Sequence, residues 1–177
     1  MPRPIILLFL CALVSPLTAH AGAPQALALA EQAVHRAEQT ANQDPQGLVA
    51  RVNDLAMEYL IQGELLQAER QYQRALAFQE QVTGSEDPRV ANTLDNLAWV
   101  QVKEAHYDQA ESLFRQSLAI RERTLGPDHP LVARSLTNLA ALYLYWDRAE
   151  EVPPLTKRAV TIWSGDRHGG DSNPSQR

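Results

Sequence analysis

Hydrophobic residues recur along most of the chain at positions i, i+3, i+4 and i+7, the spacing of one face of an α-helix. In the segment 48–62 this stripe consists of Val52, Leu55, Ala56 and Tyr59. Polar turns that contain glycine or proline interrupt the stripes. The pattern predicts helices over residues 26–40, 48–62, 64–82, 89–103, 108–123, 131–145 and 152–163.

The pattern repeats every 42 residues, as the positions of Leu55, Leu97 and Leu139 show. Six columns of this kind agree over three copies, with decay in the third. A repeat of this size, made of two helices, is typical of a helical solenoid, because each unit buries its apolar face only against its neighbours. The sequence therefore predicts an all-α solenoid of antiparallel helix pairs.

The turns between helices divide the chain into units. Gly84 and Gly126 are expected to end helices in left-handed geometry, and Asp87 and His129 then occupy the capping position before a proline. Pro153 limits the last helix to a start near Val152. The resulting domains are a capping helix and turn (22–47), three repeats (48–88, 89–130 and a degenerate 131–163) and a polar, disordered tail (164–177).

The N-terminus has the pattern of a secretory signal peptide at residues 1–21. One positive charge precedes an apolar run of ten residues, 5–14, and Ala19-His20-Ala21 supplies the small residues of a cleavage site before Gly22. The alternative is an uncleaved anchor, but the run is too short to cross ~30 Å of hydrocarbon. The expected product is periplasmic or secreted, without a transmembrane segment.

Composition narrows the chemistry that the mature chain can perform. The net charge is −5 and no basic stripe stands out, so nucleic acid is not an expected partner. Cys11 lies in the signal segment, which leaves the mature chain without thiol or disulfide chemistry. The five histidines form no i, i+4 pair, and no phosphate loop or nucleophile elbow is present. We expect neither an enzyme nor a metal or other cofactor.

Several segments match the sequence motifs of a known repeat family. They are VANTLDNLAWV at 90–100, YDQAESLFRQSLAI at 107–120, LGPDHP at 125–130 and VARSLTNLAALY at 132–143. With these segments the chain resembles a tetratricopeptide repeat (TPR) protein of the 42-residue kinesin light chain subtype. The resemblance implies a right-handed superhelix with a role in protein–protein interaction. Because such a resemblance indicates fold better than function, the role must be argued from the site. Ala149 and Thr156 depart from the pattern and predict a weakly packed third repeat.

In this family the first helices of the repeats line a concave surface. At ~100° per residue, the face opposite the core stripe carries amide, basic, aromatic and apolar side chains. Asn96 and Asn138 each offer a donor and an acceptor to an extended peptide backbone, and the matching asparagines of related proteins do this. The predicted peptide-binding residues are Met57, Asn92, Asn96, Trp99, Lys103, Arg134, Asn138 and Tyr145.

The roles of these residues follow from their chemistry. Trp99 and its neighbours would anchor apolar groups, while Lys103 and Arg134 would contact an acidic side chain or a C-terminal carboxylate. Alternatively, Met57, Ile61 and Tyr145 pack between repeats. The predicted function is a non-enzymatic protein–protein interaction module. A self-associating envelope scaffold and an envelope-glycan binder are the alternatives.

Overall fold

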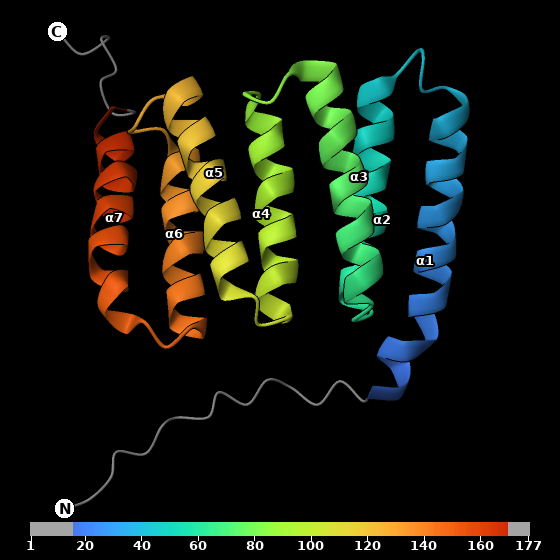
Figure 1. The fold of residues 1–177 in the computed structure, drawn as a ribbon, viewed down its shortest axis with the longest axis horizontal. Coiled ribbons are helices and arrows are strands. Elements are labelled where there is room, and N and C mark those ends of the chain that lie inside the picture. The colour runs from blue at the N-terminus through green and yellow to red at the C-terminus, as the bar shows by residue number, and fades with distance from the viewer. Residues whose placement is uncertain (1–15, 170–177) are drawn as a thin grey trace, which may run out of the picture.

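The computed structural model describes residues 16–169, with side chains from residue 24 to residue 165. The apolar run 5–14 and the end of the expected tail, 170–177, lie outside the described residues. Within the described part the chain forms seven α-helices and one 3₁₀ turn, and no strand (Figure 1). The elements are α1 (Pro16–Gln39), α2 (Pro45–Ile61), α3 (Leu65–Thr83), α4 (Pro88–Lys103), α5 (Tyr107–Leu125), α6 (Pro130–Tyr145), η1 (Ala149–Glu151) and α7 (Val152–Gly169).

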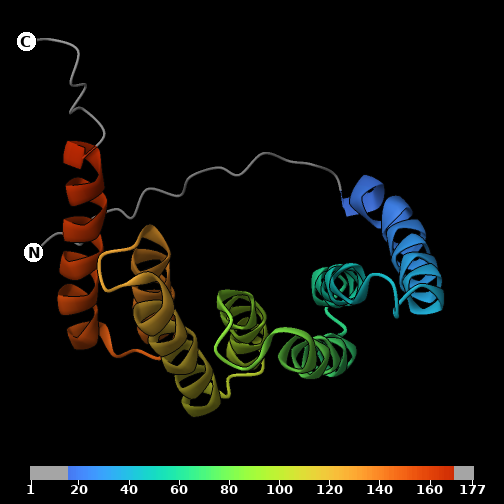
Figure 2. The same ribbon diagram turned by 90° about the horizontal axis from the view of Figure 1, so that it is seen from above.

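The helices stack side by side in chain order and form an arch (Figures 1 and 2). The pairs α2/α3, α4/α5 and α6/α7 are the three repeats, and α1 packs on α2 through Val34 against Leu48, Val52 and Leu55. Seen from above, α2 and α4 lie on the inner side of the arch and α3 and α5 on its outer side (Figure 2). The all-α solenoid that the periodicity predicts is confirmed.

The first helix of each repeat begins with a side-chain cap followed by proline. Asp44 caps α2, the carboxylate of Asp87 accepts a 2.8 Å hydrogen bond from the backbone N–H of Arg89, and Nδ1 of His129 accepts one of 3.1 Å from that of Leu131. The Arg89 guanidinium also bonds to Asp87 and lowers the pKa of this carboxyl from 3.8 to about 2. The predicted capping roles of Asp87 and His129 are confirmed.

Two glycines end the second helices, but their geometry differs from the expected one. Gly84 has φ +85° and ψ +158°, and Gly126 has φ +89° and ψ +157°. A left-handed helical residue has ψ near +30 to +60°, so the expected conformation is wrong. The observed region is accessible almost only to glycine, because a Cβ would collide with the backbone. The requirement for glycine at these turns is therefore stricter than the sequence suggests.

The turns inside the repeats share a positive φ at one column of the repeat. Gly63, Ala105 and Asp147 have φ of +78°, +60° and +57°, and they lie 42 residues apart. Only Gly63 is a glycine, the residue type that adopts a positive φ without steric cost. The second and third repeats therefore carry backbone strain at the turn that joins their two helices.

The core consists of the predicted stripes, with small residues where two helices approach. Ala56, Ala68 and Ala98 are fully buried. Tyr72 and Phe114 fill the aromatic column and are also fully buried, and burial raises the pKa of the Tyr72 hydroxyl to about 12. Thr156 occupies this column in the third repeat, where it is exposed and bonds to backbone carbonyls of its own helix. The third repeat thus lacks its aromatic core residue.

The two end helices are longer than the sequence suggests. Helix α1 begins at Pro16 rather than near Ala26, and α7 starts at Val152 as predicted but continues to Gly169, past the boundary expected at Ser164. Alanine is frequent between residues 19 and 23, which favours the longer α1. In the described range, no helix combines the length and apolar character needed to span a bilayer.

Candidate functional site

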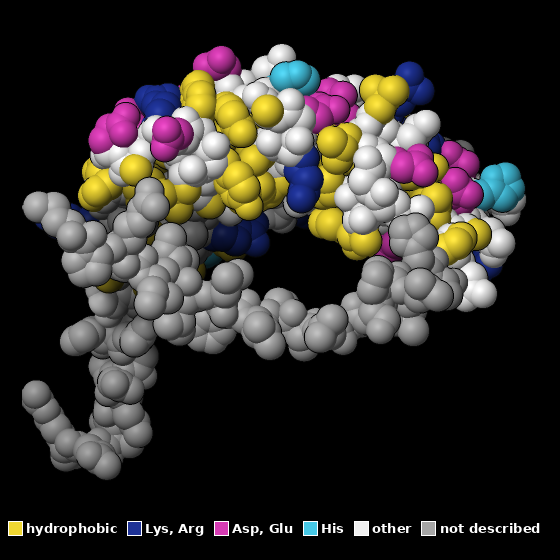
Figure 3. Space-filling view, turned by 90° about the horizontal axis from the view of Figure 1, so that it is seen from below, with side chains coloured by type: hydrophobic (Ala, Val, Ile, Leu, Met, Phe, Trp, Pro, Cys, Tyr) yellow, Lys and Arg dark blue, Asp and Glu magenta, His cyan; other side chains and the backbone are white. Residues whose placement is uncertain are grey.

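The inner side of the arch carries two adjoining hollows, which we call the concave groove. The first has a volume of about 260 Å³ and is formed by α4 and α6. The second, of about 270 Å³, is formed mainly by α2 and α4. Asn92 and Asn96 line both, so the two hollows adjoin at α4. Figure 3 shows the molecule arched over a central hollow, with Lys and Arg side chains along part of its edge.

Two unpaired amides lie in the first hollow. Asn96 on α4 and Asn138 on α6 are half-buried and 42 residues apart, so they occupy the same column of neighbouring repeats. Neither carboxamide has a hydrogen-bond partner within the described residues. Each therefore presents one carbonyl acceptor and two N–H donors to a ligand. Asp54 holds this column in the first repeat and forms an ion pair with Arg51 at 2.9 Å instead.

Asn92 and Arg134 contact each other across the α4–α6 junction. The Asn92 carbonyl accepts hydrogen bonds from Arg134 at 2.5 Å and from Arg121 at 2.8 Å, so its oxygen is occupied and only its NH₂ group remains for a ligand. The Arg134 side chain is 49% exposed and reaches to 3.8 Å from Asp95. Its guanidinium is therefore held at the rim of the hollow with donors to spare.

A buried ion pair supports this rim, and the sequence did not point to it. The guanidinium of Arg121 on α5 is fully buried and lies 2.8 Å from Oδ2 of Asp95, whose side chain is 6% exposed. Arg121 also donates to Ser117 at 2.8 Å and to Ser135. Burial lowers the pKa of Arg121, and the negative charge of Asp95 opposes this shift. The charged residues that line the first hollow, Asp95 and Arg134, cancel in net charge, and Arg121 lies buried behind them.

Trp99 closes one end of the first hollow. Its ring packs edge-to-face on buried Phe114 with ring centroids 5.3 Å apart, and on Tyr145 with centroids 6.1 Å apart. One edge of Trp99 thus belongs to the core while the residue still lines the hollow. Tyr145 is 65% exposed and borders Trp99 without lining the hollow. The aromatic end of the groove is therefore formed by Trp99, with Tyr145 packed beside it.

The structure brings five of the eight predicted residues together in the first hollow: Asn92, Asn96, Trp99, Arg134 and Asn138. Lys103 is exposed at the last turn of α4 and does not line it. Met57 is 39% exposed on α2, with its sulfur 3.9 Å from the Tyr72 hydroxyl, and lines neither hollow. The sequence did not predict Asp95 in the first hollow or most of the residues that line the second hollow.

The second hollow adds further polar groups from α2, α3 and α4. Gln46, Asn53, Gln79, Arg89 and Thr93 line it together with the two shared asparagines. Gln79 and Thr93 are buried, and the Thr93 hydroxyl donates to the Asn53 carbonyl at 3.5 Å. Within the described residues, no group of three or more His, Cys, Asp or Glu side chains is arranged to hold a metal ion. The groove is thus an amide- and guanidinium-rich surface suited to hydrogen bonding.

Stacked helix pairs with a polar groove along their inner helices define a helical-repeat interaction protein. A family model described as tetratricopeptide repeat matches residues 48–123 and 106–164. Because these matches span more than half of the chain, the protein belongs to the tetratricopeptide repeat family, and its repeats are of the kinesin light chain-like type. No curated protein matches the chain.

Solved structures with the same fold include repeats of kinesin light chain type. Nearly identical TPR-like repeats from a Podosopora anserina kinesin light chain align with a TM-score of 0.68 and 24% identity, over 83% of this chain and 70% of that one. BtubC (BKLC) from P. vanneervenii aligns with a TM-score of 0.56 and 19% identity, over 90% and 79%. At these identities the similarity establishes the fold, and function must be argued from the groove.

Proposed function

We propose that this protein is an exported, non-enzymatic interaction module that binds an extended peptide or a helix of a partner protein in the concave groove. Tetratricopeptide repeats are protein–protein interaction modules, and folds of this type typically serve as scaffolds. The observation that carries the proposal is the pair of unpaired amides, Asn96 and Asn138, in one hollow. Their regular spacing suits the repeating donors and acceptors of a peptide backbone.

The remaining lining residues support a division of roles. Trp99 and Tyr145 offer aromatic surface that would anchor an apolar side chain at one end of the groove. Arg134 lies at the rim with free donors and would select a carboxylate. Lys103 and Met57 lie outside the hollows and would contribute only to a ligand longer than the groove.

Affinity capture with a matched control tests this proposal. The bait is the chain from Gly22, compared with an Asn96→Ala/Asn138→Ala/Arg134→Ala variant and with an Arg70→Ala/Gln109→Ala control on exposed positions of the second helices. We expect one envelope protein to be retained by the unaltered bait and the control, and to be lost with the triple variant. Circular dichroism should show equal helicity for all three. Equal recovery on all baits would rule out the concave groove.

Export rests on the signal-peptide pattern at residues 1–21, and its test is separate. N-terminal sequencing or intact mass of the protein from a cell-envelope fraction should give a chain that begins at Gly22. A chain that retains Met1 in the cytoplasmic fraction would refute export without affecting the groove.

A second candidate function is self-association through the end of the third repeat. Val102 and Leu118 are covered by the repeat that follows them, whereas their equivalents Leu144 and Val160 are 62% and 60% exposed. Trp163, three residues after Val160 on α7, is 42% exposed. A terminal repeat usually has a polar outer face. Light scattering should show a dimer that Leu144→Glu/Val160→Glu disperses and that Leu66→Glu, another exposed leucine, does not. A concentration-independent monomer would remove this function.

A further inference from the structure

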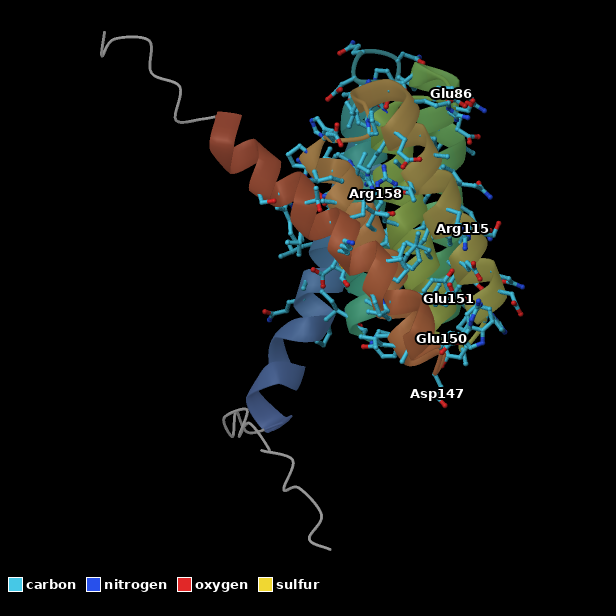
Figure 4. The ribbon with its side chains drawn as sticks, turned by 90° about the vertical axis from the view of Figure 1, so that its left-hand side faces the viewer. Glu86, Arg115, Asp147, Glu150, Glu151 and Arg158 are labelled. Atoms are coloured by element: carbon cyan, nitrogen blue, oxygen red, sulfur yellow. The ribbon has the colours of Figure 1, made fainter. Side chains whose placement is uncertain are left out.

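An ion pair that joins α1 to α3 recurs between α5 and α7, two repeat lengths further along the chain. Glu38 on α1 pairs with Arg74 on α3. Eighty-four residues further on, Glu122 on α5 pairs with Arg158 on α7 at 2.6 Å. Figure 4 looks at the end of the array that α7 covers and labels Arg158. In both places the arginine lies 36 residues after its glutamate, so the two pairs occupy equivalent positions in the solenoid.

The central junction, between α3 and α5, lacks this pair. Glu80 holds the glutamate column, but the arginine column is occupied by Gln116. The Gln116 amide bonds to Ser112 of its own helix at 3.3 Å rather than crossing to α3. Glu80 is exposed, and its carboxylate has no partner within the described residues. One arginine of a regular series is therefore missing, and its acceptor remains.

An open groove lies where this arginine would cross. Its volume is about 340 Å³, within the range of ligand pockets, and Glu80 and Gln116 both line it. Its wall and floor are apolar, and they are formed by Leu76, Val90, Leu94, Leu113, Ala119 and Ile120. The groove lies on the opposite side of the array from the concave groove, because α3 and α5 form the outer side (Figure 2).

The charge around this outer groove favours a cation. Glu86 and Arg123 also line it and pair with each other, so they cancel in net charge. Glu80 is left as the uncompensated charge, which gives the groove a net charge of −1. A cationic group beside Glu80 would therefore supply the positive charge that Arg74 and Arg158 supply at the other two junctions.

We propose that the α3–α5 groove is a second docking site, which takes a segment of a partner protein carrying an arginine next to a leucine-like side chain. The partner's guanidinium pairs with the Glu80 carboxylate, in the manner of Arg74 with Glu38 and Arg158 with Glu122. Its apolar neighbour covers Leu76 and Leu113. The site is independent of the concave groove, so one protein could bridge two partners.

The probe for this site is an acetylated and amidated Leu-Arg dipeptide, titrated into the ¹⁵N-labelled protein. We expect the amide resonances of Glu80, Leu113 and Ile120 to shift together, with a Kd on the order of 1 mM for so small a ligand. The same dipeptide with citrulline in place of arginine has the same shape without the charge and should bind at least tenfold more weakly. Glu80→Gln should weaken the arginine probe by a similar factor.

Two substitutions on α5 separate occupation of the groove from a general charge effect. Gln116→Arg restores the residue of the other two junctions and should abolish binding of the probe while keeping the melting temperature. Gln109→Arg adds the same charge at an exposed position of α5 outside the groove, and binding should stay within about twofold. The Asn96→Ala/Asn138→Ala variant should bind the probe normally.

Three results would overturn the proposal. The first is the absence of shifts with the Leu-Arg probe, and the second is equal binding of the citrulline probe. The third is a dimer of the unaltered protein that Gln116→Arg converts to a monomer in sedimentation velocity, because the occupant would then be a second copy of this chain. If Gln116→Arg does not fold, binding of the Leu-Arg probe to Glu80→Gln alone tests the proposal.

Discussion

The buried pair of Asp95 and Arg121 allows a quantitative test of what holds the second and third repeats together. Arg121 is fully buried and Asp95 nearly so, at a separation of 2.8 Å. Removal of one member leaves the other charged and out of water, which typically costs 3–5 kcal/mol. We therefore expect Asp95→Leu and Arg121→Met each to lower the free energy of unfolding by about 3–5 kcal/mol, with a fall in Tm on the order of 10 °C.

The double variant should behave differently because the pair is imperfectly satisfied. Within the described residues, both carboxylate oxygens of Asp95 and Nε of Arg121 lack a hydrogen bond of good geometry, although the ionic contact is close. Desolvation is then not fully offset, and a well-packed apolar pair is often as stable or more stable. We expect Asp95→Leu/Arg121→Met to recover most of the loss, with a coupling energy of about 3 kcal/mol or more.

Urea unfolding followed by far-ultraviolet circular dichroism measures the cycle. The control is Arg51→Ala, which breaks the Arg51–Asp54 pair at the surface, where both side chains are more than half exposed. Such a pair contributes about 0–1 kcal/mol. If Asp95→Leu costs no more than this control, Arg121 is not desolvated as the structure indicates. If the losses of the two single variants add in the double variant, the two side chains do not interact.

Three further predictions concern caps and turns. Asp87→Ala should cost about 1 kcal/mol at neutral pH. Because the pKa of Asp87 in the folded protein is about 2, below its usual 3.8, its stabilising contribution is present above pH 4 and is lost as the pH falls through 2. The difference in urea midpoint between the unaltered protein and Asp87→Asn should therefore be constant above pH 4 and change as the pH falls from 4 through 2. Ala105→Gly should stabilise by about 0.5–1 kcal/mol by thermal melting, since φ is positive there, and the same change at helical Ala119 should destabilise. Gly126→Ala should cost about 1–3 kcal/mol in urea unfolding, and a cost below 0.5 would refute the glycine-only geometry.

The fold could be predicted because its causes are local and repeated. A stripe such as Leu94, Leu97, Ala98 and Gln101 fixes which side of a helix is buried, and all four residues are buried. Asp87 and Pro88 mark a helix start through the backbone groups of a single turn. The sequence did not predict the full length of α1 and α7, because no hydrophobic stripe continues into residues 16–25 and 164–169.

The composition of the groove could be predicted only in part. A helical wheel places Trp99 and Lys103 on one face, but four residues also advance ~6 Å along the axis, which carries Lys103 out of the hollow. Asp95 and Arg121 are charged residues on amphipathic helices, and such residues usually face water. Their burial depends on how α4, α5 and α6 meet. The missing partner of Glu80 likewise becomes visible only when Arg74 and Arg158 are seen to cross between helices.

The third repeat, with Thr156 in its aromatic column, forms one wall of the first hollow through Arg134 and Asn138. Each unit of a solenoid is held only by its neighbours, so the terminal unit opens locally at a lower free energy than the centre. In amide hydrogen exchange, α6 and α7 should therefore lose protection before α4. A ligand that spans α4 and α6 binds only the closed unit and would slow that exchange without touching α7. Order at the end of the array would then report whether the groove is occupied.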